Sequence, residues 1–203
     1  MYLVKTPPIA KKIFCDYVWD IPTEEKVLYF TFDDGPIPEV TPMVLDILRD
    51  FSAKATFFCV GDNVRKYPKI FERILSEGHS VGNHTFHHLN GWKTPKEIYL
   101  DDVEQCHKLV SSKLFRPPYG KITREQAHTL KSDYKIIMWD ILCGDFDRRV
   151  TSNDCFARMK KHASPGSIIV LHDSLKTQKC VRQALPTTLQ FFMDQGYRFE
   201  RIV

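Results

Sequence analysis

The stretch Val27-Leu28-Tyr29-Phe30-Thr31-Phe32-Asp33-Asp34-Gly35-Pro36 decides the fold class, because an apolar run ends there at two adjacent carboxylates. A run so rich in aromatic and β-branched side chains predicts a buried strand, and the Gly-Pro pair predicts a turn after it. Successive strand residues face opposite ways, so both carboxylates can reach one site only where the chain turns. The alternative is that Asp33 and Asp34 only form a capping turn at the strand end.

Strand-like and helical patterns alternate along the rest of the chain. Further strands are expected at 55–61, 80–84, 134–140, 167–173 and, as an edge strand, 197–203, with one more ending at Phe115-Arg116. Helices are expected from Thr41 as N-cap, over 64–77, over 94–112 behind a Thr94–Glu97 capping box, over 123–131, from Thr151 and over 181–195. About seven strands alternating with helices predict a parallel sheet, either a barrel or a doubly wound sheet. Residues 1–26 are expected to be an N-terminal extension packed on that core.

The composition is that of one globular domain of 203 residues, with 43% hydrophobic and 27% charged side chains. The net charge of +4 is scattered and forms no basic stripe, so nucleic acid is not an expected partner. No apolar segment approaches the ~18 residues that a membrane span needs. The N-terminus lacks the pattern of a secretory signal, so a cytoplasmic location is the default expectation and cell-envelope association stays open.

Six cysteines are spread along the chain without a Cys-x-x-Cys pair, which excludes zinc-finger and thioredoxin-like motifs. Reduced thiols are expected in the absence of an export signal, although an even number would also suit disulfides in an exported protein. Nothing in the sequence fixes the oligomeric state.

His84-Thr85-Phe86-His87-His88 places two histidines, His84 and His88, at the spacing i, i+4. On a helical turn these two would lie on one face and could hold a single ion. His87 is the rival second ligand, at the poorer i, i+3 spacing. Two imidazoles, one aspartate and an open position suit Zn²⁺, with Co²⁺ or another divalent ion as alternatives. The structural alternative is a surface cluster of histidines that binds no metal.

The chemistry-bearing residues share one position in the expected fold, at or just beyond the carboxyl ends of strands. They are Asp33, Asp34, His84, Arg116, Asp145 and His172. In a barrel of parallel strands, catalytic sites are built at this rim. Polar residues placed for solubility would not prefer the rim, so the pattern predicts one shared site.

Five motifs, in order from about Val27 to the C-terminus, resemble those of the polysaccharide deacetylases of carbohydrate esterase family 4, the NodB-homology group. The motifs are Thr31–Pro36, His84–His88, Arg116–Gly120, Trp139–Phe146 and Val170–His172. The resemblance implies a distorted (β/α) barrel with fewer strands than the usual eight, and a NodB-homology catalytic domain over 27–203. It also implies a carbohydrate substrate from which an acetyl group is hydrolysed.

The resemblance assigns the metal and the base. Asp34, His84 and His88 would bind one divalent metal. Asp33 would be the general base that takes a proton from water, and Arg116 would pair with it. A neighbouring cation favours the ionised carboxylate, which is the form that can accept a proton.

The resemblance also assigns the acid, the oxyanion contact and the substrate contacts. The backbone N–H of Tyr119 would stabilise the oxyanion, a role often worth ~2.7–4 kcal/mol. His172 would be the general acid, oriented by Asp145 and kept protonated by it, and Asp140 is the rival for that partner role. The expected substrate contacts are Pro118, Tyr119, Phe146 and Val170.

Two departures from the family pattern bear on the substrate. Leu142-Cys143-Gly144-Asp145-Phe146 lacks the first aspartate of the family's Asp-x-x-Asp-Trp and has Phe146 for its tryptophan, while Val170 replaces a leucine. The expected reaction is removal of the N-acetyl group from a polymer or oligosaccharide that contains N-acetylglucosamine, such as peptidoglycan or chitin. The alternatives are an O-acetyl esterase acting on xylan, an amidohydrolase of small cyclic amides, and a carbohydrate-binding homologue without catalysis.

Other conspicuous side chains are interpreted as structural. His79 is expected to make a backbone hydrogen bond, and His107, His128 and His162 are expected at the surface. Trp19 and Trp92 either pack against the core or serve as sugar platforms if they reach the rim.

Overall fold

The structure is a computed structural model that describes residues 2–203. Its strands are β1 (Val27–Asp33), β2 (Ala55–Cys59), β3 (Ser80–Asn83), β4 (Leu114–Phe115), β5 (Lys135–Ile136), β6 (Ile141–Leu142), β7 (Ile168–His172) and β8 (Arg198–Phe199). Its α-helices are α1 (Pro8–Ile13), α2 (Thr41–Asp50), α3 (Gly61–Lys66), α4 (Pro68–Ser76), α5 (Lys96–His107), α6 (Arg124–Leu130), α7 (Ser152–His162) and α8 (Gln178–Met193). Two short 3₁₀ turns, η1 (Gly91–Lys93) and η2 (Pro118–Gly120), complete the elements.

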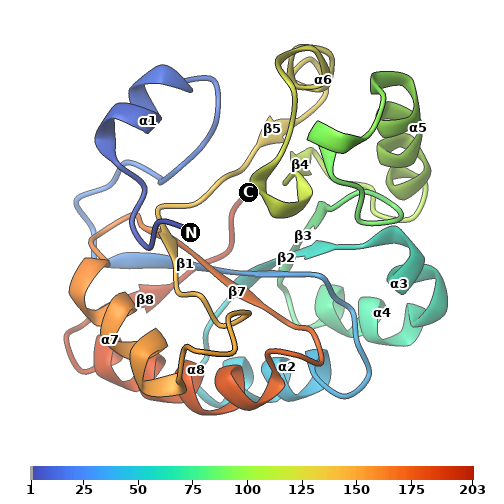
Figure 1. Ribbon diagram of the computed structural model, residues 1–203. Coiled ribbons are helices and arrows are strands. Elements are labelled where there is room, and N and C mark those ends of the chain that lie inside the picture. Colours follow the sequence, from blue (N-terminus) through green and yellow to red (C-terminus); the bar gives the residue numbers. More distant parts are fainter. Residues whose placement is uncertain (1) are drawn as a thin grey trace.

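The strands form one sheet in the order β5-β4-β3-β2-β1-β7-β6, and every pairing is parallel. The additional strand β8 pairs with the start of β1, also in parallel. The sheet curls into a half-barrel, with α7, α8 and α2 in a row along one side and α5 and α6 on the other (Figure 1). The predicted distorted barrel of about seven parallel strands is therefore confirmed.

Strand β1 runs through the middle of this sheet and separates two chemical environments. Leu28, Phe30 and Phe32 alternate along it and join the apolar core under the helices. Thr31 and Asp33 lie on the opposite face, inside the half-barrel, where both accept a hydrogen bond from one guanidinium. This alternation follows from the two-residue period of a strand and aims Asp33 at the interior.

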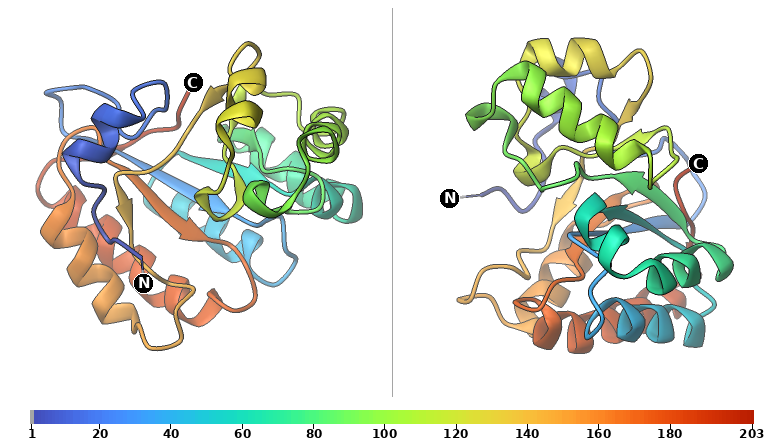
Figure 2. Two further views of the ribbon diagram at one scale, coloured as in Figure 1. Left: turned by 45° about the horizontal axis from the view of Figure 1, so that its top comes forward. Right: turned by 90° about the vertical axis from the view of Figure 1, so that its right-hand side faces the viewer.

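The edges of the half-barrel, β5 and β6, are bridged by the start of the chain. Lys5 pairs with Ile141 in antiparallel fashion, and Val18 pairs with Ile137 in parallel. Residues 2–21, which we call the N-terminal segment, thus lie across the gap that the two edge strands leave between them (Figure 2).

The strand expected over 134–140 is interrupted in its middle. Pairing stops at Ile136 and resumes at Ile141, as β5 and β6. The backbone between them bonds elsewhere: Met138 N–H donates to Val18 O, and Asp140 O accepts from Thr6 N–H. Backbone groups used in this way cannot join a strand ladder, so the apolar pattern was right but the continuous strand was wrong.

Three helix boundaries also differ from expectation. The helix expected over 64–77 is divided, because Tyr67 precedes Pro68 and adopts φ −128°, ψ 54°. The helix expected over 94–112 begins at Lys96 and ends at His107, without the capping box: Thr94 Oγ1 instead donates to Asn90 O. Thr41 is the first helical residue rather than the N-cap. The cap at Thr151 is confirmed as a capping box with Asp154.

Candidate active site

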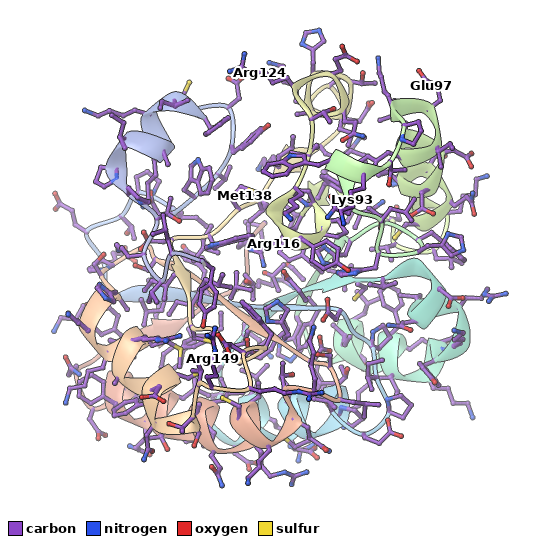
Figure 3. The ribbon with its side chains drawn as sticks, in the orientation of Figure 1. Lys93, Glu97, Arg116, Arg124, Met138 and Arg149 are labelled. Carbon is purple, nitrogen blue, oxygen red and sulfur yellow. The ribbon has the colours of Figure 1, made fainter. Side chains whose placement is uncertain are left out.

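A cavity of about 500 Å³ opens at the carboxyl ends of the central strands. Residues from all five resemblance motifs line it, including Asp33, Asp34, His84, His88, Tyr119, Phe146 and His172. Arg116, which directly follows β4, lies in the middle of the molecule (Figure 3), and its guanidinium contacts Asp33. The structure thus brings the dispersed motifs of the sequence to one place.

Asp34, His84 and His88 form a cluster that fits a divalent metal. Their candidate ligand atoms all lie within 4.8 Å of one another. Asp34 Oδ1 is 3.2 Å from His88 Nε2 and 4.0 Å from His84 Nε2. One carboxylate oxygen and two imidazole nitrogens converging on one point are a donor set that suits zinc and related ions.

The surroundings of His84 prepare its ring for ligation. Its Nδ1 lies 2.7 Å from Arg116 O, so Nδ1 carries the proton and donates, leaving the Nε2 lone pair for a metal. Burial lowers the pKa of His84 to about 4. The imidazole is therefore neutral at physiological pH, which is the form that can act as a ligand.

Asp34 is ionised in the same cluster. Burial alone would raise its pKa, but the neighbouring His88 and the charges of His172 and His84 hold it well below its ordinary value. The side-chain amide of Asn63 donates to Asp34 O at 2.8 Å and fixes the backbone of the loop. A charged carboxylate in a fixed position is what a metal ligand requires.

Backbone strain is concentrated at this cluster. Five non-glycine residues among 2–203 have positive φ, and four of them are Asp34 (85°), Thr85 (60°), His88 (57°) and Tyr119 (61°). Left-handed backbone at such residues costs ~1–3 kcal/mol each and persists where surrounding contacts enforce it. The strain locates the loops whose shape serves the site rather than the fold.

The histidine pair reaches the site by a different route from the one expected. Residues 84–88 form no helical turn, so the i, i+4 argument was wrong although both histidines converge. Asp102 holds the loop by accepting from the N–H groups of Phe86 and His87 at 2.8 and 2.9 Å. The His87 ring bonds Asp102 Oδ1 at 2.5 Å and is 57% exposed, which turns this rival ligand away from the cluster.

Arg116 is a fully buried cation, 0% exposed, beside Asp33. Its Nη1 donates to Asp33 Oδ1 and Thr31 Oγ1 at 2.7 Å, while Nε and Nη2 donate to the carbonyl oxygens of Ile137 and Met138. Every donor group of the fork has an acceptor, which is the condition for burying a guanidinium. Asp33 is thereby held with one oxygen paired and its carboxylate at the cavity wall.

His172, at the end of β7, is bound to Asp145 rather than to its rival Asp140. Asp145 Oδ1 lies 2.8 Å from His172 Nδ1, and Oδ2 accepts from His172 N–H at 2.7 Å. Burial alone would lower the pKa of His172, but the Asp145 carboxylate raises it to about 9. Asp140 lies elsewhere and pairs with Lys5 and Lys11.

The residues expected to contact substrate fall in two groups. Tyr119, Phe146 and Val170 line the cavity. The Tyr119 ring is exposed and stands edge-on to His88, and the Phe146 ring stands edge-on to His172. Pro118 is buried in the η2 turn, where it shapes the backbone of Tyr119 instead of reaching the cavity.

Sequence reasoning missed several supporting groups. Asp173 accepts from Gly35 N–H at 3.0 Å and from Thr41 Oγ1 at 2.5 Å, and so holds the turn that presents Asp34. Tyr2 and Leu3 from the N-terminal segment line the cavity. Trp19, expected either to pack against the core or to reach the rim, lines it as well, whereas Trp92 does not. A short-range pattern could not reveal these contacts, because each joins residues more than a hundred positions apart or lies in an irregular segment.

The cysteines and His79 have the structural surroundings expected of them. The six cysteines are free, and His79 makes its expected backbone contact, with Nδ1 accepting from Ala55 N–H at 3.2 Å. In residues 2–203 we found no helix with the length and apolar character of a membrane span.

Comparisons with known proteins identify the family and agree with the fold. The family model for polysaccharide deacetylases matches residues 20–135. A peptidoglycan-N-acetylglucosamine deacetylase of Bacillus cereus is 36% identical over 191 residues, which cover 89% of this chain and 88% of the relative. The peptidoglycan-N-acetylmuramic acid deacetylase PdaA of Bacillus subtilis is 32% identical and is aligned over 89% of this chain and 71% of its own length.

The solved structure of the Bc1960 peptidoglycan N-acetylglucosamine deacetylase superposes with a TM-score of 0.88 at 30% identity, covering 96% of this chain and 94% of that one. Other curated relatives are longer, and the chain spans 60% of one and 38% of another. The family match and the relatives place the chain among hydrolases that act on carbohydrates. The chain belongs to the polysaccharide deacetylase family, carbohydrate esterase family 4, whose members hydrolyse amide bonds.

Proposed function

We propose that this enzyme removes the N-acetyl group from N-acetylglucosamine residues of peptidoglycan and releases acetate, using a divalent metal held by Asp34, His84 and His88. One observation carries the proposal: a triad whose ligand atoms could hold a metal, a carboxylate paired with arginine and a histidine paired with aspartate surround a single cavity. A protein that only binds a carbohydrate, without turnover, would need none of these three groups of side chains. The choice of peptidoglycan is supported by what the relatives are named for.

Zn²⁺ is the proposed ion, with Co²⁺ as the nearest alternative, because the donor set is one carboxylate and two imidazoles. When bound, a divalent ion of this kind lowers the pKa of its water from ~15.7 to about 7 and polarises a carbonyl group. The rest of the reaction depends on side chains of the chain itself.

Asp33 is the proposed general base. Its carboxylate is 2.7 Å from Arg116 Nη1, and that contact fixes its orientation while leaving the second oxygen free to accept a proton from the attacking water. The backbone N–H of Tyr119, in the strained η2 turn, would donate to the carbonyl oxygen as negative charge develops there.

His172 is the proposed general acid. The C–N bond breaks as His172 gives its proton to the leaving amine, so the ring must start protonated, and Asp145 favours that state. Val170, buried at the cavity wall, would contact the acetyl methyl group, and Phe146 and the Tyr119 ring would contact the sugar.

N-acetylmuramic acid is a second candidate for the sugar that loses its acetyl group. Lys176 lines the cavity, and its Nζ lies 3.9 Å from Asp34 Oδ2. A muramic acid residue without its peptide stem carries a free lactyl carboxylate, for which an ammonium group at the cavity wall is a suitable partner. The similarity to PdaA of Bacillus subtilis favours the same substrate.

Measurement of acetate release distinguishes the N-deacetylase from an O-acetyl esterase and from an inactive homologue. The purified enzyme is loaded with Zn²⁺ and incubated with peptidoglycan, with chitin oligomers and with acetylated xylan, before and after chelation. Release from peptidoglycan that is lost on chelation and restored by Zn²⁺ is the expected result, and mass spectrometry of muramidase digests identifies the sugar. Release from xylan alone would assign an O-acetyl esterase instead, and sugar binding without turnover under any metal would assign an inactive homologue.

A further inference from the structure

One wall of the cavity comes from the N-terminal segment rather than from the half-barrel. Leu3, Pro7, Ala10 and Trp19 line the same cavity as the metal-binding cluster and His172. Trp19 is half-buried, and its Nε1 donates to Phe14 O at 3.0 Å, which fixes the indole relative to the segment. The segment therefore presents an apolar surface with one oriented aromatic ring to whatever occupies the cavity.

The backbone of this segment is joined to the rim of the half-barrel at both ends. Thr6 N–H donates to Asp140 O and Leu142 N–H donates to Val4 O. Farther along, Val18 and Ile21 donate their N–H groups to Ile136 O and Gly166 O. Between these two attachments, α1 has no buried residue, so no apolar packing of the helix anchors the wall to the core.

Asp140 holds the middle of the segment by its side chain. Its two oxygens accept from Lys5 Nζ and Lys11 Nζ, each at 2.6 Å, and from Ser167 Oγ at 2.7 Å. The Asp140 side chain is 2% exposed, whereas the two lysines are partly exposed. Burial alone would raise the pKa of Asp140, but the bonds from Lys11 and Lys5 lower it, so the carboxylate stays charged.

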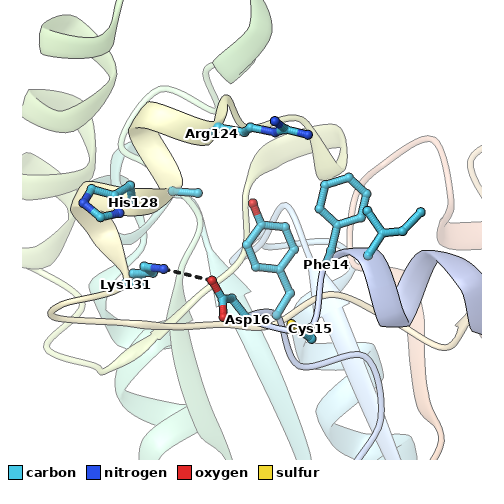
Figure 4. A pocket seen from close by; sticks show the side chains of 9 residues that line it. Phe14, Cys15, Asp16, Arg124, His128 and Lys131 are labelled. Carbon is cyan, nitrogen blue, oxygen red and sulfur yellow. Dashed lines mark hydrogen bonds and ion pairs between the residues drawn. The ribbon is translucent and has the colours of Figure 1, made fainter.

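A second ion pair joins the same segment to α6 on the outside of the molecule. Lys131 Nζ lies 2.8 Å from Asp16 Oδ2, beside a surface pocket lined by Phe14 and Arg124 (Figure 4). The side chains of Lys131 and Asp16 are 42% and 61% exposed, and exposed ion pairs of this kind contribute little to stability. Asp140 and Asp16 thus both bind lysines at the N-terminal segment, but Asp140 is buried and Asp16 is exposed. Replacing each in turn therefore gives a matched comparison.

We propose that Asp140 is a positioning residue that holds the N-terminal segment, through Lys5 and Lys11, as a wall of the substrate groove, and that Trp19 on this wall stacks against a sugar ring adjacent to the one that loses its acetyl group. The inference rests on the proposed function of the cavity. An indole has a flat apolar face that matches the C–H face of a pyranose ring, and its size makes it a strong contact for a ligand. A buried carboxylate with two cations adds little net stability but fixes geometry, which is the property that a wall needs.

The first experiment compares Asp140→Asn with the matched variant Asp16→Asn. Each is assayed with 4-nitrophenyl acetate, which requires the hydrolytic groups but no wall, and with a tetramer of N-acetylglucosamine, which requires both. In Asp140→Asn, KM for the tetramer is expected to rise roughly tenfold while hydrolysis of the small ester and the zinc content stay near wild type. Asp16→Asn is expected to behave as wild type with both substrates.

Hydrogen exchange supplies a readout that does not depend on activity. Amides of residues 4–21 are expected to exchange faster in Asp140→Asn, while those of β1 keep their protection. Unchanged exchange in the segment, or an equal rise of KM in Asp16→Asn, would overturn the positioning role. If wild-type enzyme hydrolyses neither substrate, the proposed function fails; if it hydrolyses both and Asp140→Asn keeps its KM, this inference alone fails.

The second experiment tests the wall without touching a buried charge. Trp19→Ala is expected to raise KM for the tetramer about tenfold and to leave kcat with the small ester unchanged. Trp19→Phe should recover part of the loss. Trp92→Ala is the control, because Trp92 is an exposed indole that donates to Ile122 O and does not line the cavity. Equal KM values for Trp19→Ala and Trp92→Ala would refute the stacking role.

Discussion

Asp145 holds His172 at two points, accepting from its backbone N–H at 2.7 Å and contacting its ring Nδ1 at 2.8 Å. The two contacts fix both the end of β7 and the rotation of the ring, which leaves Nε2 for the cavity. Burial alone would lower the pKa of His172, and the raised value of about 9 therefore depends on Asp145. The pair makes a protonated imidazole available at neutral pH.

Replacement of Asp145 should move the alkaline limit of activity. A general acid works only while protonated, so the wild-type rate is expected to fall as pH rises through about 9. In Asp145→Asn the main cause of the raised pKa of His172 is gone, so kcat should fall and the alkaline limb should shift to lower pH. Rate profiles between pH 6 and 10 measure both effects. Asp147→Asn, whose carboxylate binds the exposed Arg149, is the control, and an unmoved limb in Asp145→Asn would assign the acid role elsewhere.

Asp33→Asn and His84→Ala should separate catalysis from metal binding. Asp33 lies outside the cluster of candidate ligands, so its amide variant is expected to keep one metal per chain and lose roughly 10²–10⁴-fold in kcat. His84→Ala removes a ligand and should lose the metal as well. Elemental analysis beside the assay of acetate release makes the distinction. A variant Asp33→Asn that turns over at the wild-type rate would exclude this residue as the base.

Arg116 and Arg149 should differ sharply in their effect on stability, although both pair with an aspartate (Figure 3). Arg116→Ala leaves Asp33 buried without its cation and is expected to cost about 3–5 kcal/mol of unfolding free energy. The Arg149 side chain is 87% exposed, and Arg149→Ala should change the free energy by less than ~0.5 kcal/mol. Urea denaturation of both variants tests this, and similar midpoints would contradict the burial argument.

Gly35→Ala should damage the site more than the fold. A Cβ at position 35 would lie 2.0 Å from Asp173 Oδ2, so the turn that presents Asp34 would have to shift. Lower zinc affinity and lower kcat are expected, and zinc titration of the apo-enzyme measures the first. Gly196→Ala is the comparison, because its Cβ would meet nothing within 4 Å and only left-handed strain of ~1–2 kcal/mol is added. Unchanged zinc affinity in Gly35→Ala would show that the turn tolerates the shift.

The sequence predicted those parts that depend on short-range pattern. Strand periodicity located β1 and β7, and the position of polar residues after strands located the rim of the site. The path of residues 84–88 could not be predicted, because their convergence depends on left-handed backbone at Thr85 and His88 and on distant Asp102. Spacing alone led to the two histidines that converge with Asp34, but by an incorrect geometry.

Contacts between residues far apart along the chain explain the other differences. The strand expected over 134–140 is interrupted because its backbone bonds to Val18, Thr6 and Arg116. In the same region, the Asp140 side chain binds lysines of the N-terminal segment. The sequence suggested Asp140 only as a rival of Asp145 for the role of partner to His172. No local pattern in Lys5 or Lys11 indicates a buried carboxylate more than a hundred residues away.

The division of labour around the cavity has an evolutionary consequence. The hydrolytic groups come from the half-barrel, whereas a whole side of the groove comes from residues 2–21, which supply no candidate metal ligand, base or acid. Exchange of these first residues between homologues could therefore alter which glycan is accepted without disturbing bond cleavage.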